Sequence, residues 1–110
     1  MAYNGKPFFK IPRPVLLAGG VEVSTLAGNI TLTDKSSLFQ ILDADGVTRN
    51  VTLPPEKHGR VYIIKNAGAA GDLAVKDDAA GGVITLSPNE SVVLTCDDTI
   101  WYVVINVNNL

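Results

Sequence analysis

The residues of this chain that are best suited to chemistry are its clustered aspartates, its single histidine and its single cysteine. Asp43, Asp45 and Gly46 in D-A-D-G have the order of residues that begins a calcium-binding loop. Such a loop also needs a further ligand before the glycine and a glutamate at its twelfth position, where this chain has Pro54. The pattern therefore predicts a hairpin turn.

The other aspartates and the histidine also lack partners of the right kind. Asp77 with Asp78, and Asp97 with Asp98, are neighbours in sequence, so their side chains would diverge on a strand. We therefore expect turns rather than a carboxylate pair that shares a proton. His58 has no second histidine and no assignable nucleophile to complete a triad, so we expect it in a solvated loop.

The single cysteine fits a core position. Cys96 is in phase with Val92 and Leu94, which indicates a small buried residue rather than a nucleophile. One cysteine cannot form an internal disulfide, and one histidine cannot form a histidine-rich metal site. The sequence thus predicts no catalytic residue, no metal site and no cofactor, and a protein that is not an enzyme.

Length and composition fit one small globular domain. The chain has 110 residues, of which 46% are hydrophobic and 18% charged, with a formal net charge of −2. These values are unlike those of a disordered or nucleic-acid-binding protein. The apolar runs are far shorter than the ~20 residues that cross a bilayer, and the first twenty residues lack the layout of a signal peptide. We expect synthesis in the cytoplasm, without a nucleic-acid or membrane partner.

Charge divides the chain into an extended N-terminal arm at 1–21 and a single β domain at 22–110. The arm has 3 basic residues and no acid, whereas the domain has 6 basic and 11 acidic residues, a net charge of −5. Three prolines keep the arm extended. It also carries large apolar side chains that something must cover. The partner-binding residues that we predict in it are Lys6, Phe8, Phe9, Lys10, Ile11 and Arg13.

Two places are open for this arm. It could pack on its own domain as an edge strand, or it could reach a neighbouring subunit or another protein, which we favour.

Short β-branched runs separated by turn sequences make up the rest of the chain. They begin roughly every 8 to 12 residues, and none has an apolar period of 3.6 residues over a helical length. The predicted strands are 22–26, 29–33, 37–42, 49–53, 60–65, 72–76, 83–86, 91–96 and 100–107. They predict an all-β fold, a small antiparallel sandwich or barrel of about eight short strands.

A weak internal repeat begins at 30, 51 and 84 with I-T-L, V-T-L and I-T-L. The starts are 21 and 33 residues apart, so the repeat lacks the fixed period of a solenoid. We interpret the copies as pseudo-symmetric strand pairs within one domain. Isoleucine, valine and leucine should face the core, and threonine should face outward.

Two predicted strands, 60–65 and 100–107, are apolar on both faces. A sheet in a sandwich needs only one apolar face. Either the arm covers the second face, or that face contacts another subunit. We favour subunit contact, because so small a domain has few elements with which to cover it.

Three segments together resemble a β domain of tailed-bacteriophage virion proteins, among them capsid decoration (cement) proteins and fibre-associated modules. They are L-F-Q-I-L-D-A-D-G-V-T-R-N-V-T-L-P at 38–54, V-Y-I-I-K-N-A-G at 61–68 and D-D-T-I-W-Y at 97–102. The resemblance covers about residues 28 to 105.

The resemblance implies a structural protein without catalytic residues. We expect a capsid decoration protein on the virion surface, a homotrimer whose partner is the major capsid protein and which stabilises the head by bridging capsid subunits. The alternative is a tail or head-fibre module that binds a host-surface glycan. That function needs exposed aromatic platforms, whereas the neighbours of Trp101 indicate burial.

Overall fold

The computed structural model describes residues 18–108, and this part of the chain is all β, as predicted. No helix in it could span a membrane. Each predicted strand overlaps an observed one with ends within two residues. The strands are β1 (Val21–Thr25), β2 (Ile30–Thr31), β3 (Phe39–Asp43), β4 (Arg49–Thr52), β5 (Val61–Asn66), β6 (Leu73–Lys76), β7 (Gly82–Leu86), β8 (Ser91–Cys96) and β9 (Trp101–Val107).

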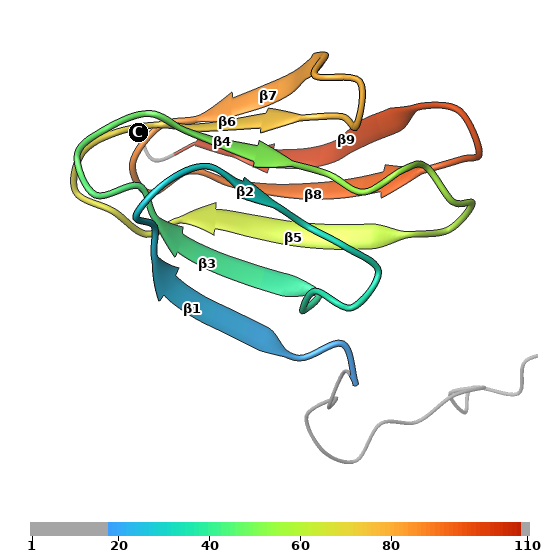
Figure 1. Ribbon diagram of the computed structural model, residues 1–110, viewed down its shortest axis with the longest axis horizontal. Coiled ribbons are helices and arrows are strands. Elements are labelled where there is room, and N and C mark those ends of the chain that lie inside the picture. The colour runs from blue at the N-terminus through green and yellow to red at the C-terminus, as the bar shows by residue number, and fades with distance from the viewer. Residues whose placement is uncertain (1–17, 109–110) are drawn as a thin grey trace, which may run out of the picture.

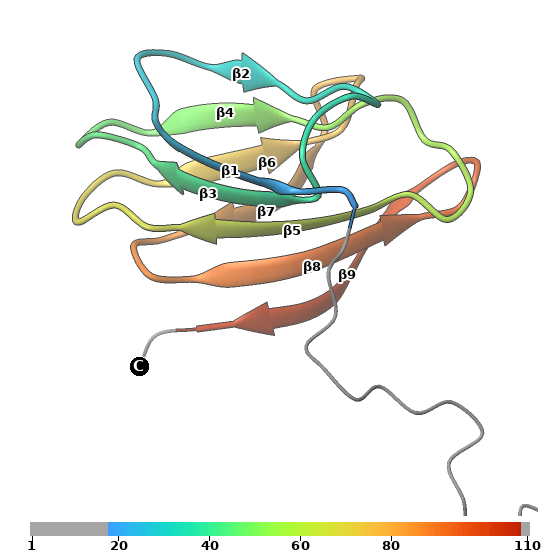
Figure 2. The same cartoon turned by 90° about the horizontal axis from the view of Figure 1, so that it is seen from below.

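Strands β1 to β6 alternate between two sheets (Figure 1). One sheet has the order β1-β3-β5-β8-β9 and the other the order β2-β4-β6-β7, and Figure 2 shows them from a second side. From β1 to β6 the chain winds through three coils, so the pairs β1–β3, β3–β5, β2–β4 and β4–β6 are parallel. The last three strands then add antiparallel pairs to β5 and β6.

The pairing corrects the expected antiparallel arrangement. Most of the predicted turns lead across to the other sheet, and the same Gly, Asp and Asn residues suit such arches and hairpins alike. The rejected solenoid pattern is present in part, because Ile30 pairs in parallel with Val51, and Val51 with Val75, one coil later each time. The third repeat copy begins in the antiparallel β7, which explains the unequal spacing.

The core lies between the sheets, and its side chains follow the predicted alternation. Across the four-stranded sheet, one inward row contains Ile30, Val51, Val75 and Ile84. The five-stranded sheet contributes Leu42, Tyr62, Ile64, Val92, Leu94, Cys96 and Trp101. The threonines of the repeat lie on the outer face, where Thr31 and Thr85 are exposed, as predicted.

A buried polar residue ties this core to the turns. Asn66, at the end of β5, is fully buried. Its side-chain amide donates hydrogen bonds to the carbonyl oxygens of Gly71 (3.0 Å) and Leu86 (2.9 Å), and its Oδ1 accepts one from the N–H of Gly68 (3.1 Å). Asn66 therefore fixes the turn between β5 and β6 and joins it to β7 of the opposite sheet.

The loops gather at two ends of the strands. We call the end where the chain enters β1 the entry end; it holds the turn at Ala18–Gly20 and the loops 32–38, 53–60, 77–81 and 97–100. The loops 26–29, 44–48, 67–72 and 87–90 lie at the opposite end. In Figure 1 the entry end is on the right.

Candidate functional site

The clustered aspartates cap turns. In D-A-D-G, Asp43 Oδ1 accepts the N–H of Asp45 (2.8 Å), while Asp45 and Gly46 have positive φ. This turn joins β3 to β4 in the other sheet, so it is an arch rather than the predicted hairpin. Asp77 Oδ1 likewise accepts the N–H groups of Ala79 (3.0 Å) and Gly81 (2.7 Å). One carboxylate oxygen of Asp43 and one of Asp77 thus accept hydrogen bonds from the backbone of their own turns.

Asp97 closes the β8–β9 turn. Its Oδ1 accepts the N–H groups of Ile100 (2.8 Å) and Thr99 (2.7 Å), and these bonds lower the pKa of its carboxyl. The Tyr102 hydroxyl donates to Asp97 Oδ2 (3.1 Å), and this bond to a carboxylate raises the pKa of the Tyr102 phenol.

This turn should respond to acid. Because the pKa of Asp97 in the folded state lies below the ordinary value of 3.8, its contribution to stability is present above that value and is lost as the pH falls through the folded pKa. We expect the carboxyl carbon of Asp97 to titrate below pH 3.8 by NMR, and the exchange of the Ile100 amide to accelerate in the same range. A midpoint at or above 3.8 would contradict the capping role.

The histidine and the cysteine lie where the sequence places them. His58 is exposed in a loop, and its backbone N–H donates to Asp98 Oδ1 (3.1 Å). Cys96 is 4% exposed, and its thiol donates to the carbonyl of Lys57 (3.2 Å). Within residues 18–108, no three His, Cys, Asp or Glu side chains gather as a metal site. The predicted partner-binding residues Lys6, Phe8, Phe9, Lys10, Ile11 and Arg13 lie outside the described residues.

The outer face of the five-stranded sheet carries an unbroken apolar row. In register across the five strands stand Val21, Phe39, Ile63, Val93 and Ile105. A second row begins with Val23 and Ile41, continues through Lys65 and Ser91, and ends at Val107, while Val61 and Tyr102 flank Thr95 in a third. We call these ten apolar side chains the apolar face: Val21, Val23, Phe39, Ile41, Val61, Ile63, Val93, Tyr102, Ile105 and Val107.

The apolar face is open at both edges of the sheet. Val23 is 71% exposed and Ile105 is 54% exposed, whereas Ile63 and Val93 in the middle are half-buried by their neighbours. A shallow apolar depression of about 40 Å³ lies among Ile63, Val93, Ile105 and Val107. The β5 and β9 parts of this face were predicted from the sequence, because these two strands are apolar on both faces. The β1 and β3 parts were not predicted, although V-E-V and F-Q-I have the same alternation.

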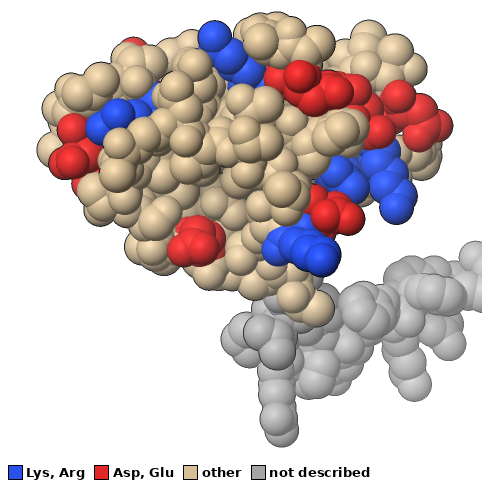
Figure 3. Space-filling model, in the orientation of Figure 1, with Lys and Arg blue, Asp and Glu red and all other residues tan. Residues whose placement is uncertain are grey.

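The outer face of the four-stranded sheet has the opposite character. Its outward residues are small or polar: Thr31, Asn50, Thr52, Ala74, Lys76 and Thr85. In Figure 3, charged side chains lie around the margin of the molecule and leave the middle of the view uncharged. One sheet therefore presents an ordinary solvent face, and the other presents apolar surface of the kind found at protein interfaces.

Strand β9 is exposed on both faces and along one edge. It stands at the end of its sheet, and all its residues after the buried Trp101 are exposed. Its sequence W-Y-V-V-I-N-V has no charge and no proline, the features with which monomeric proteins usually protect an edge strand. A bulge between Val93 and Leu94 leaves Val104 as an extra residue, 56% exposed. An edge of this kind is suited to contact with another chain.

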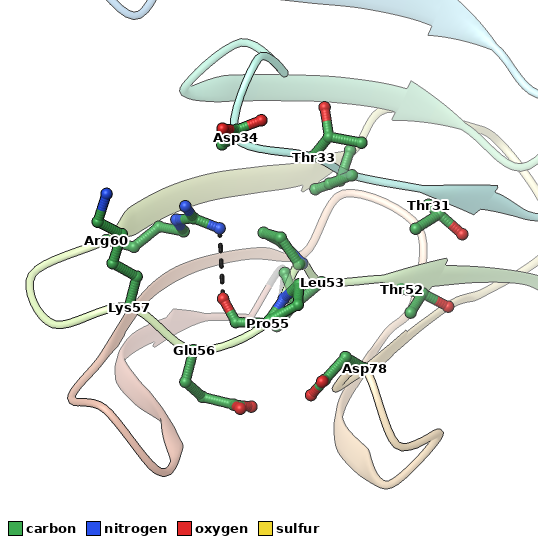
Figure 4. Close-up of a pocket in the computed structure, with 12 residues that line it drawn as sticks. Thr31, Thr33, Asp34, Thr52, Leu53, Pro55, Glu56, Lys57, Arg60 and Asp78 are labelled. Atoms are coloured by element: carbon green, nitrogen blue, oxygen red, sulfur yellow. Dashed lines mark hydrogen bonds between the residues drawn. The ribbon is translucent and has the colours of Figure 1, made fainter.

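A groove of about 690 Å³ opens at the entry end, beside the ends of β2 and β4 (Figure 4). Its lining includes the buried side chains of Leu32, Leu53 and Pro54. The charged residues Asp34, Glu56, Lys57, Arg60 and Asp78 surround this apolar floor. Three separate loops contribute them, which is why no motif in the sequence predicts the groove.

Among residues 18–108, no aromatic side chain lines the groove. The single tryptophan, Trp101, is 6% exposed, and its Nε1 donates to the carbonyl of Pro54 (3.2 Å). The described part of the groove thus offers no aromatic ring for stacking.

Comparison of the chain with protein-family models, with curated proteins and with solved structures finds no match.

Proposed function

We propose that this protein is a structural component of a tailed-bacteriophage virion, a capsid decoration protein that binds the outer capsid surface and stabilises the head. The observation that carries the proposal is the apolar face. Ten apolar side chains cover the outside of one sheet, while the other sheet faces solvent with small and polar ones. The resemblance of residues 28–105 to virion β domains supplies the class of partner.

The proposed mechanism is bridging. Full burial of a valine or isoleucine side chain contributes about 1.5 to 3 kcal/mol, so a few such side chains on each copy supply a substantial binding free energy. A homotrimer attached at three points holds its capsid subunits together, because their separation must also break the contacts with the trimer. In this proposal the apolar face lies on the capsid, and β9 forms the contacts within the trimer.

Val23→Asp should abolish capsid attachment. Val23 lies on β1, at the opposite edge of the sheet from β9. An aspartate at this position that is buried against the capsid would lose its hydration without gaining a partner. The measurement is co-sedimentation of purified protein with heads from a phage deleted for this gene. The matched control Thr85→Asp places the same charge on the opposite, solvent-facing sheet and should bind like the natural protein. If the natural protein does not bind these heads, the proposed function is wrong.

The isolated protein should sediment as a trimer, and Val104→Asp should yield a monomer. Val104 is the extra residue of the β9 bulge, so its substitution changes the exposed edge without touching the core. Analytical ultracentrifugation separates the two species. A stable dimer, or a Val104→Asp trimer, would contradict the role of β9.

A further inference from the structure

The chain enters the body beside the groove. Two glycines form the turn before β1: Gly20 has φ +75°, and a Cβ on Gly19 would lie 2.6 Å from Leu38 Cβ. Gly19 also lines a depression of about 290 Å³ at the entry end. Asp34 and Arg60 line both this depression and the groove, so the two hollows are adjacent.

The groove and the N-terminal segment complement each other in charge and polarity. Around the groove, Figure 4 shows the carboxylates of Asp34, Glu56 and Asp78; the hydrogen bond drawn there joins Arg60 to Pro55 and engages none of them. Residues 1–17 have three cationic side chains and no carboxylate side chain. They also include the large apolar residues Phe8, Phe9 and Ile11. The rim also holds the cations Lys57 and Arg60, so three carboxylates and two cations give it a net charge of −1. An apolar floor with a rim of net negative charge matches a cationic segment that carries large apolar side chains.

We propose that the groove of the free protein holds residues 1–17 of the same chain. Phe8 to Arg13 lie six to eleven residues before Gly19, a span of roughly 20 to 36 Å when extended, which is ample for the path along the depression. In an extended segment Phe9 and Ile11 share a side, so both can face Leu32 and Leu53. Attachment at Gly19 keeps the segment at a high effective concentration, which favours its own groove over that of another copy.

This inference places the arm on its own domain, but in the groove rather than as the edge strand that the sequence leaves open, and it concerns the protein in isolation. It does not rest on the proposed capsid function, so either can fail without the other. The prediction that the same six arm residues bind a capsid or a neighbouring subunit concerns the assembled state.

Zero-length cross-linking with a carbodiimide tests the docking on the natural chain. The reagent joins a lysine amine to a carboxylate that it touches, with loss of water. We expect amide links from Lys6 or Lys10 to Asp34, Glu56 or Asp78, and none to Asp45 or Asp72 at the opposite end. Protein labelled with ¹⁵N and unlabelled protein are refolded together before the reaction. Links within one isotope support the proposal, whereas mixed-isotope links, or no links to the groove, overturn it.

Limited proteolysis supplies a second measurement with a matched control. Proline follows Lys6 and Arg13, so Lys10–Ile11 is the one bond in residues 1–17 that trypsin cleaves readily. Removal of two groove charges in Asp34→Asn/Glu56→Gln should speed this cleavage severalfold. Asp45→Asn/Asp72→Asn removes the same charge from the opposite end and should leave the rate unchanged. Equal rates in all three proteins would overturn the docking.

Discussion

Asn66→Ala is expected to lower the free energy of unfolding by about 3 to 5 kcal/mol, among the largest effects of any single substitution in this chain. The change removes three hydrogen bonds at once, those of the Asn66 side chain with the carbonyls of Gly71 and Leu86 and with the N–H of Gly68. Each unsatisfied buried group costs about 1 to 3 kcal/mol. Alanine also leaves a cavity between the two sheets.

Urea denaturation followed by circular dichroism measures this loss. The control is Asn106→Ala on the exposed strand β9, which should change the free energy of unfolding by less than about 0.5 kcal/mol. Equal effects of the two substitutions would show that the buried amide network does not hold the turn.

Gly71→Ala is expected to cost about 2 to 4 kcal/mol. Gly71 has φ +86°, and a Cβ there would lie 2.7 Å from the backbone nitrogen and 2.9 Å from the carbonyl oxygen of Val47. Both are main-chain atoms of the neighbouring coil, where Gly46 N–H also donates to Ala70 O (3.1 Å). The substitution must therefore push two stacked turns apart.

Gly28→Ala is the matched control for this substitution. Gly28 also lies in a turn at the opposite end, but a Cβ there meets no atom within 4 Å and its φ is not in the left-handed region. The expected change is within about 0.5 kcal/mol, and alanine can even stabilise by restricting the unfolded chain. Thermal unfolding by calorimetry compares the two. A Gly71→Ala protein as stable as Gly28→Ala would refute the close contact with Val47.

The positions of the strands could be predicted from the sequence, but their partners could not. Alternation at Ile30 and Leu32, or at Val51 and Leu53, identifies a strand and its buried face. It does not distinguish a neighbour reached by a hairpin from one reached after a full coil. Parallel pairing of Ile30 with Val51 depends on the arch at 44–48 crossing to the other sheet, and D-A-D-G suits either path.

Part of the apolar face could be predicted from the sequence, whereas the rest of it and the groove could not. Residues 61–64 predict a second apolar face, because every side chain in this run is apolar or aromatic and successive side chains of a strand point to opposite faces. The contribution of Val21 and Val23 depends on the pairing of β1 with β3, which only the tertiary structure shows. The groove combines Asp34, Glu56 and Asp78 from three loops that only the winding of the coils brings together.

The antiparallel strands that follow β6 have a consequence for the nascent chain. Strand β8 pairs with β5, and β7 pairs with β6. Both β7 and β8 leave the ribosome after β6 and before β9. Until residues 82–96 emerge, both sheets end in an unpaired apolar strand, a state prone to pairing with other chains. A chain that stops after Cys96 lacks only the exposed edge, whereas one that stops after Lys76 has two open edges. Premature termination is therefore far more hazardous at the second point.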